Sequence, residues 1–186
     1  VPDIVAATTE PLAVGLHAVR EARLRGGESV LVMGAGPIGL FAIQAVRVKG
    51  AGKVIALDVR EERLAIARKL GADITINPSQ GDVKAEMQRI VGRPDVDAVL
   101  EAVGTPPAVQ LGFDLVRRGG HLTLIGNVTP KVEVNLQDLI MRELNIRGSF
   151  AIAGEYRAVL DLMAQGRIQT KPLISRSVPL SEGQGG

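Results

Sequence analysis

Three glycines at positions 34, 36 and 39 have the spacing of a turn that can hold a pyrophosphate. Gly34-Ala-Gly36-Pro-Ile-Gly39 follows the apolar run 29–33 and precedes a segment with helical periodicity, which is the strand–turn–helix context that a dinucleotide fingerprint requires. Gly34 would permit the tight turn, Gly36 would let the phosphates approach, and Gly39 would let the helix pack closely on the strand. Pro37 suits the first helical turn, and the free N–H groups at that end of the helix favour an anion.

A carboxylate lies at the end of the next predicted strand. Asp58 comes 19 residues after Gly39, where it can accept hydrogen bonds from both hydroxyls of an adenosine ribose. A 2′-phosphate would meet like charge there, so the sequence predicts NAD in preference to NADP. Arg60 or Arg63 could turn toward a 2′-phosphate, and Arg63 is more simply expected at the ribose. We therefore predict a preference and not exclusivity.

The elements that must position these residues alternate along the chain. Strands are expected at 29–33, 54–57, 74–76, 96–100, 121–125 and 145–148, and helices at 37–49, 61–70, 82–91, 107–116 and 135–142. Parallel neighbours need crossover helices, so the pattern predicts an α/β Rossmann fold with a doubly wound, six-stranded parallel sheet and flanking helices. Beyond this sheet, a helix is expected at 155–165 and extended chain at 171–175 and 178–180.

Composition restricts the classes of partner. The chain has 22 Lys and Arg residues and 20 Asp and Glu residues, and positive and negative charges alternate along it. This balance disfavours nucleic acid as a binding partner. There is no Cys, so disulfides and thiolate zinc ligands are excluded. The apolar stretch 30–46 is interrupted by the glycines of the turn, which favours strand–turn–helix over a membrane span. Because no leader is seen at Val1, a cytoplasmic location is expected, and the ending at 183–186 suggests a piece of a longer protein.

Three longer stretches of the sequence match the pattern of a known protein family. They are Glu10-Pro-Leu-Ala-Val-Gly-Leu-His-Ala18, Val30–Leu40 with the glycine turn, and Asp58 followed by Arg63–Ala72. The chain, from about Val5 to Leu180, resembles the zinc-containing medium-chain dehydrogenases, and most closely their sorbitol, threonine and butanediol branch. The resemblance implies that Ile38 packs behind the nicotinamide ring of NAD. It also implies further cofactor-binding positions: Ala102, Val103 and Gly104 along the adenosine and ribose path, and Ile125, Gly126, Asn127, Ser149 and Phe150 at the nicotinamide end.

The resemblance also predicts where the catalytic metal of the intact enzyme would bind and whether this chain alone would catalyse the reaction. Glu10, an acid just before a helix, matches a glutamate that faces the catalytic zinc of the polyol branch, but here it has no partner ligands. His17 and His121 lack partners at metal-binding spacing, so no metal site and no catalytic residue are expected in this chain. The family's Gly-His-Glu motif and zinc-binding Cys are absent, so zinc is expected only in the missing catalytic domain. The intact enzyme would transfer a hydride between a secondary alcohol or polyol and NAD, and this chain alone would bind NAD without turnover.

The resemblance sets the expected boundaries and assembly. Residues 1–7 would end the catalytic domain, 8–152 would form the NAD-binding domain, and 153–186 would return toward the catalytic domain. The edge of the sheet is expected to form a homodimer or tetramer.

Two other classes of protein stay open, while a third is disfavoured. One is the cofactor domain of a zinc-free quinone or enoyl reductase, which should lack an acid like Asp58 and prefer NADPH. The other is a non-enzymatic, nucleotide-sensing Rossmann domain. A short-chain dehydrogenase is disfavoured because Leu160 stands where its motif requires a lysine four residues after Tyr156.

Overall fold

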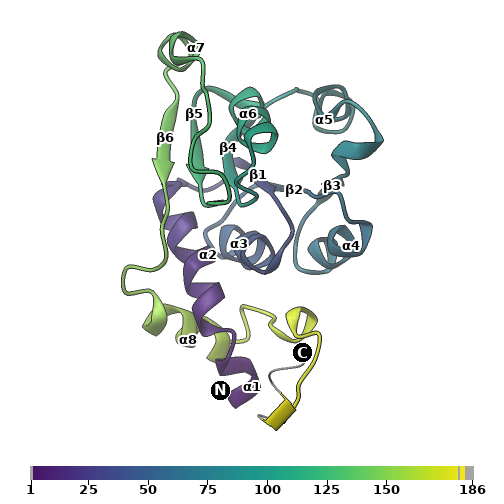
Figure 1. Ribbon diagram of the computed structural model, residues 1–186, viewed down its shortest axis with the longest axis vertical. Coiled ribbons are helices and arrows are strands. Elements are labelled where there is room, and N and C mark those ends of the chain that lie inside the picture. Colours follow the sequence, from purple (N-terminus) through teal and green to yellow (C-terminus); the bar gives the residue numbers. More distant parts are fainter. Residues whose placement is uncertain (1, 180, 183–186) are drawn as a thin grey trace.

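Six parallel strands form one sheet in the computed structural model, which describes residues 2–179, 181 and 182 (Figure 1). The strands are β1 (Ser29–Met33), β2 (Lys53–Leu57), β3 (Ile74–Ile76), β4 (Val96–Glu101), β5 (Val116–Leu124) and β6 (Asn145–Gly148). Their spatial order is β3-β2-β1-β4-β5-β6, and each neighbouring pair is parallel. The predicted doubly wound Rossmann fold is confirmed. From β1 the chain adds strands toward one edge of the sheet up to β3, and from β4 it adds them toward the other edge. Ligands of such sheets bind in the crevice at the carboxyl ends of the strands where this order switches, here β1 and β4.

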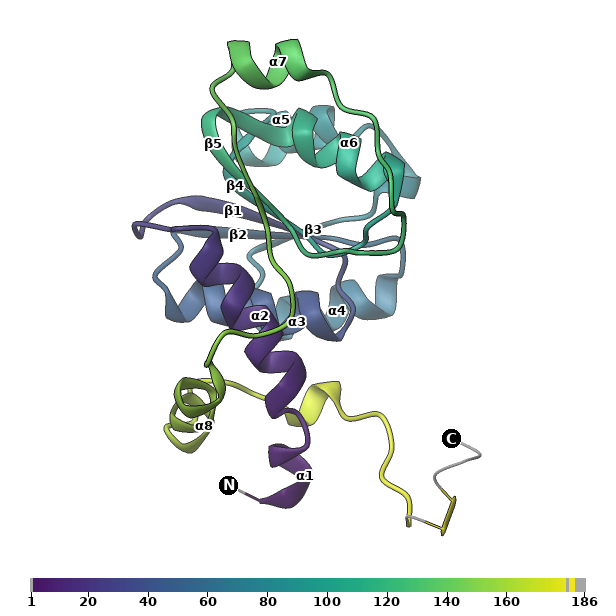
Figure 2. The same cartoon turned by 60° about the vertical axis from the view of Figure 1, so that its left-hand side comes forward.

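Helices cover both faces of the sheet. Figure 2 shows α2 (Thr9–Glu21), α3 (Pro37–Val48) and α4 (Glu61–Lys69) on one face, and α5 (Val83–Val91) and α6 (Pro106–Leu115) on the other. Val30 and Val32 of β1 join the core of the first face, whereas Leu31 and Met33 join that of the second. All four are fully buried. A strand that is buried on both faces has to be apolar throughout, which explains the run at 29–33.

Smaller elements lie at the two ends of the molecule. The remaining helices are α1 (Asp3–Ala6), α7 (Leu136–Met141) and α8 (Tyr156–Ala164), with 3₁₀ turns η1 (Pro78–Gln80) and η2 (Lys171–Leu173). α7 stands at one end, and α1, α8 and the last part of the chain lie at the other (Figures 1 and 2). α8 packs against α2, and the Gln44 side chain exchanges two hydrogen bonds, of 3.0 and 2.7 Å, with the main chain of Gln169. The segment after β6 is therefore fixed to the helices of the first face. No helix in the described ranges has the length and apolarity needed to cross a membrane.

Two predictions about local structure are wrong. β5 begins at Val116 and not at residue 121, because the register shifts between the Val96–Val116 and Ala98–His121 pairs. Gly119, at φ +69°, supplies the left-handed conformation that this bulge uses. Residues 171–173 form η2 and are not extended, since Pro172 has a φ that suits a helical turn.

The other predicted helix and strand ends agree with the structure to within one residue. Leu180 and residues 183–186, which figure in the predictions for the end of the chain, lie outside the described residues.

Candidate functional site

The turn between β1 and α3 has the geometry expected of the glycine fingerprint. Gly34 has φ +88°, a left-handed conformation that favours glycine, and its N–H donates to the Leu57 carbonyl at 2.7 Å. A Cβ on Gly39 would lie 1.8 Å from the Gly34 carbonyl oxygen. The tight turn and the close helix–strand packing predicted for these two glycines are therefore present.

Gly36 differs from the other two glycines because nothing within the protein requires it. Its φ is −72°, which any residue can adopt, and a Cβ placed there would find only the Arg63 guanidinium, 4.0 Å away. Within the described part of the chain, the N–H groups of Gly36, Ile38 and Gly39 find no acceptor, and α3 has no side-chain cap. The open space at Gly36 is therefore bordered by unused donors at the positive end of a helix.

Asp58 joins the end of β2 to this turn. Its side chain is only 6% exposed. One carboxylate oxygen accepts the Ala35 N–H at 2.7 Å, and the other accepts the Arg60 N–H at 2.9 Å. The Arg63 guanidinium lies 3.7 Å from the first oxygen, while the Arg60 guanidinium is paired with Glu62. A carboxylate offers about four acceptor positions, so Asp58 can hold the turn and still accept hydroxyl donors from a ligand.

A cavity of about 480 Å³ opens beside the turn and Asp58. It is lined by Met33, Gly34, Gly36, Leu57, Asp58, Val59, Arg63, Pro78, Ala102, Val103, Thr105, Pro107, Ala108 and Leu111. Asp58, Arg63 and the glycine main chain supply its polar groups, and most of the other lining side chains are apolar. Sequence reasoning missed the wall formed by α6 and by Val59 and Pro78; the only signal was the apolar start of the helix after Gly104.

The carboxyl ends of β4 and β5 meet next to this cavity. Ala102 and Val103 line it, and Gly104 has φ +80°. A Cβ on Gly104 would lie 2.5 Å from the Gly126 carbonyl carbon, and one on Gly126 would lie 2.1 Å from the Gly104 nitrogen. Packing between these two turns accounts for both glycines. Ile125 and Asn127 flank this contact without lining the cavity.

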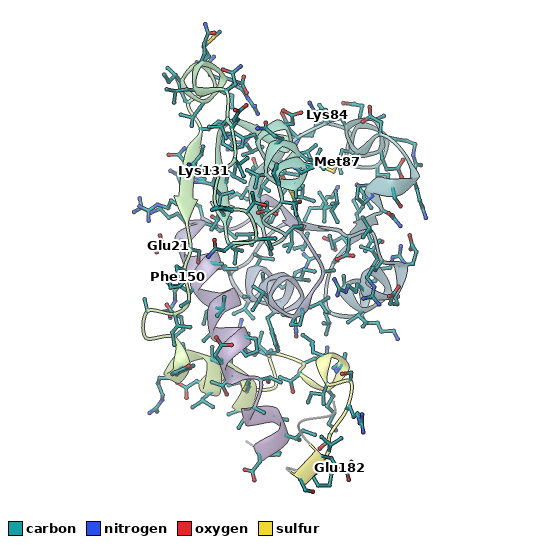
Figure 3. All side chains as sticks on the ribbon, in the orientation of Figure 1. Glu21, Lys84, Met87, Lys131, Phe150 and Glu182 are labelled. Carbon is teal, nitrogen blue, oxygen red and sulfur yellow. The ribbon has the colours of Figure 1, made fainter. Side chains whose placement is uncertain are left out.

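Ser149 and Phe150, which the resemblance places at the nicotinamide end, follow β6. The Ser149 N–H donates to the Leu124 carbonyl at 2.9 Å, and its hydroxyl is buried with no partner in the described residues. Phe150 is 82% exposed and lies on the side of the molecule along which β6 runs (Figure 3). Neither lines the cavity at Asp58.

The remaining candidate residues do not converge on a site. Glu10 is exposed and lies in the first turn of α2, one residue inside the helix that it was expected to precede. His17 and Arg20 contact the buried Glu155 at 3.2 and 2.8 Å, which ties α2 to α8. Burial would raise the pKa of Glu155, but hydrogen bonds from the Ala153 N–H, His17 and Arg20 outweigh it and lower the pKa.

No three His, Cys, Asp or Glu side chains among residues 2–179, 181 and 182 could share a metal ion. Another cavity, of about 610 Å³, lies at the end of the molecule near α1 and α8, and among the described residues that line it Lys171 is the one with a charged side chain.

A family model described as zinc-binding dehydrogenase matches residues 37–165. The chain belongs to the zinc-binding dehydrogenase family. This confirms the resemblance inferred from the sequence, and the match includes α3, Asp58 and the ends of β4 and β5. The sorbitol dehydrogenase of Bacillus subtilis is 34% identical to this chain over 180 residues, which are 96% of the chain and 51% of that enzyme.

Solved structures of family members superpose closely on the chain. A protein from Sinorhizobium meliloti 1021, described as a zinc-binding dehydrogenase and bound to NADP, is 33% identical with a TM-score of 0.88; the match covers 96% of this chain and 53% of that one. An alcohol dehydrogenase from Escherichia coli CFT073, complexed with NADH, is 28% identical with a TM-score of 0.88, covering 95% and 52%. The chain thus spans about half the length of the relatives it matches.

Proposed function

We propose that the chain binds a nicotinamide dinucleotide, with the pyrophosphate on the main chain at 34–39. Gly36 carries the proposal: in the free protein nothing fills the position of its absent Cβ and no backbone strain demands glycine. A ligand that lies against the main chain accounts for the glycine, and the three unused N–H groups match phosphate oxygens. The dinucleotide therefore fits the residues that are present.

Asp58 supports NAD as the preferred cofactor. A 2′-phosphate about 4 Å from this carboxylate would face a repulsion of about 4 kcal/mol at an effective dielectric constant near 20. Arg63 offsets part of that repulsion, whereas the pairing with Glu62 draws the Arg60 guanidinium away. The relative bound to NADP is a reason to measure the preference and not to assume it.

The shape of the cavity supports the placement of the adenine. Its apolar lining residues, which include Val59, Pro78 and Leu111, would cover a flat aromatic base. From there the dinucleotide would pass Ala102, Val103 and Gly104. Its nicotinamide would lie toward Ile38, Ile125, Gly126, Asn127, Ser149 and Phe150.

In the intact protein we propose an NAD-dependent alcohol or polyol dehydrogenase. Bound NAD would supply the acceptor for a hydride from a secondary alcohol. The zinc would belong to the other half, and we keep 8–152 as the cofactor domain and 153–186 as the segment that returns toward that half. The location is proposed as cytoplasmic. This chain alone should bind NAD without turnover, and metal-dependent alcohol oxidation by the purified chain would contradict that.

Calorimetric titration with NAD, NADP and ADP-ribose tests the proposal. We expect NAD to bind more tightly than NADP, and more tightly than ADP-ribose because the nicotinamide adds contacts. Tighter binding of NADP than of NAD would favour a quinone or enoyl reductase. Equal affinity for ADP-ribose and NAD would favour a nucleotide-sensing domain, and no binding of any of the three would refute the proposal.

A second copy of the chain is the partner we propose for the β6 edge. β6 is the last strand of the sheet, and its outer edge has no strand partner in the described residues. Exposed apolar side chains gather on α7 and directly before it: Val134, Leu136, Ile140 and Met141. An unpaired edge beside exposed apolar side chains is a typical association surface. Light scattering should show a dimer or tetramer that Ile140→Glu dissociates, and a monomer at every concentration would refute this interface.

A further inference from the structure

Glu101 is an acidic side chain in the centre of the fold that the proposed function does not use. It ends β4, pairs in register with Met33 of β1 and Leu124 of β5, and is 0% exposed. Among the described residues, no Lys, Arg or His nitrogen lies within ion-pair distance of its carboxylate. Burying a carboxylate without a cation is costly, so its remaining contacts have to compensate for the lost water.

Those contacts are main-chain N–H groups of the turn that follows β4. One carboxylate oxygen accepts from Val103 at 2.8 Å and from Gly104 at 2.9 Å, and the other lies 3.2 Å from the same Gly104 nitrogen. The main-chain carbonyl of Glu101 accepts from Ile125 at 2.8 Å and from Gly126 at 2.9 Å. The turn is also held by the Ala102 N–H, which donates to the Met33 carbonyl at 2.9 Å, and by the Gly104 carbonyl, which accepts from Thr129 at 3.1 Å. Glu101 is the residue that binds the Val103 and Gly104 N–H groups and joins the turn to the end of β5.

The turn at 102–104 needs this support because it packs tightly against the phosphate-binding turn. A Cβ on Gly34 would already lie 3.0 Å from a Val103 methyl group and 3.3 Å from the Ala102 oxygen. On the side of the turn away from Gly34, the main chain of Gly104 packs directly against the main chain of Gly126. A small shift of 102–104 would change the width of the cavity between Gly34 and Val103.

We propose that Glu101 is a positioning residue of the dinucleotide site. Its carboxylate holds 102–104 at the distance from 34–36 that a bound dinucleotide requires. The proposal rests on the proposed function, since it concerns the same cavity. It predicts that changes at Glu101 act on cofactor affinity beyond any effect on stability.

Glu101→Gln and Glu101→Asp test the proposal, with Asp97→Asn as the control. In the Gln variant an amide NH₂ replaces the second carboxylate oxygen. This NH₂ group and the Gly104 N–H are both hydrogen-bond donors, so they repel each other. The Asp variant keeps the charge but is one methylene too short to reach both N–H groups. Each should raise the Kd for NAD about tenfold, because a displaced turn at 102–104 no longer fits the dinucleotide against 34–36. Asp97 lies at the opposite end of the β4 strand, so its variant should unfold at lower temperature and still bind NAD with an unchanged Kd.

Hydrogen exchange gives a second readout. The Val103 and Gly104 amides should exchange faster in both Glu101 variants than in the control. An unchanged Kd for the Glu101 variants, in a chain that does bind NAD, would overturn this inference alone. So would a Kd that rises equally in Asp97→Asn. Failure of the unaltered chain to bind NAD would overturn the proposed function and this inference with it.

Discussion

Replacing Gly36 by alanine adds a single methyl group that should weaken NAD binding without changing the stability of the fold. The added Cβ would lie 4.0 Å from Arg63 and would touch nothing closer. Alanine stabilises by about 0.4–1 kcal/mol by restricting the unfolded chain, but it is a poorer N-cap than glycine by a similar amount. These effects offset, so the free energy of unfolding should change by less than about 0.5 kcal/mol.

Binding should respond very differently in the same variant. The methyl group would occupy the space where the phosphates approach the main chain. The loss of one or two charge-assisted hydrogen bonds at the helix end costs about 3 kcal/mol, or roughly a hundredfold in Kd. Calorimetric titration with NAD and urea unfolding of the same preparation measure the two quantities.

Gly39→Ala is the matched control for Gly36→Ala. The same methyl group at position 39 would lie 1.8 Å from the Gly34 oxygen, so the main chain has to move. Overpacking of this kind costs about 3 kcal/mol and should lower Tm by roughly 6–12 °C. Wild-type NAD affinity in Gly36→Ala, or an equal loss of stability in both variants, would refute the reasoning.

Two further predictions concern carboxylates. Asp58→Asn removes the negative charge that a 2′-phosphate would meet, so the preference for NAD over NADP should fall at least about tenfold in paired titrations; an unchanged ratio would show that Asp58 does not select the cofactor. Burial would raise the pKa of Asp97, but hydrogen bonds from Ser29 and Arg117, together with the charge of Arg93, outweigh it and hold the pKa well below its usual 3.8. Because the folded pKa is the lower one, the stabilisation is present at neutral pH and is lost as the pH falls below about 4. Asp97→Asn should therefore be less stable than wild type by about 2 kcal/mol at pH 7 and by progressively less in acid, and a pH-independent difference in urea unfolding would contradict this.

The sequence predicts the phosphate turn well because its determinants are local. A buried apolar strand, three glycines and a proline at the first helical position lie within 29–39, and each constrains the main chain by itself. Asp58 follows from the same logic one strand later. The predicted strands are present for this reason, and all but one of their starts agree with the structure to within one residue.

Features that depend on tertiary packing could not be predicted in this way. Pro107, Ala108 and Leu111 line the site only because α6 packs on β4 and β5. Glu101 ends an apolar strand, where an acid is usually solvated, and the register with β1 and β5 is what buries it. The contact between His17 and Glu155 joins residues 138 positions apart. The early start of β5 likewise depends on a bulge against β4.

A crystal structure of the chain grown with NAD tests the central claim most directly. Electron density for the two phosphates should lie against the main chain at Gly36 and the start of α3, with the adenosine ribose hydroxyls on Asp58 and the adenine against the wall formed by Val59 and Leu111. Density for the dinucleotide in any other cavity, or a ribose that makes no contact with Asp58, would contradict the account.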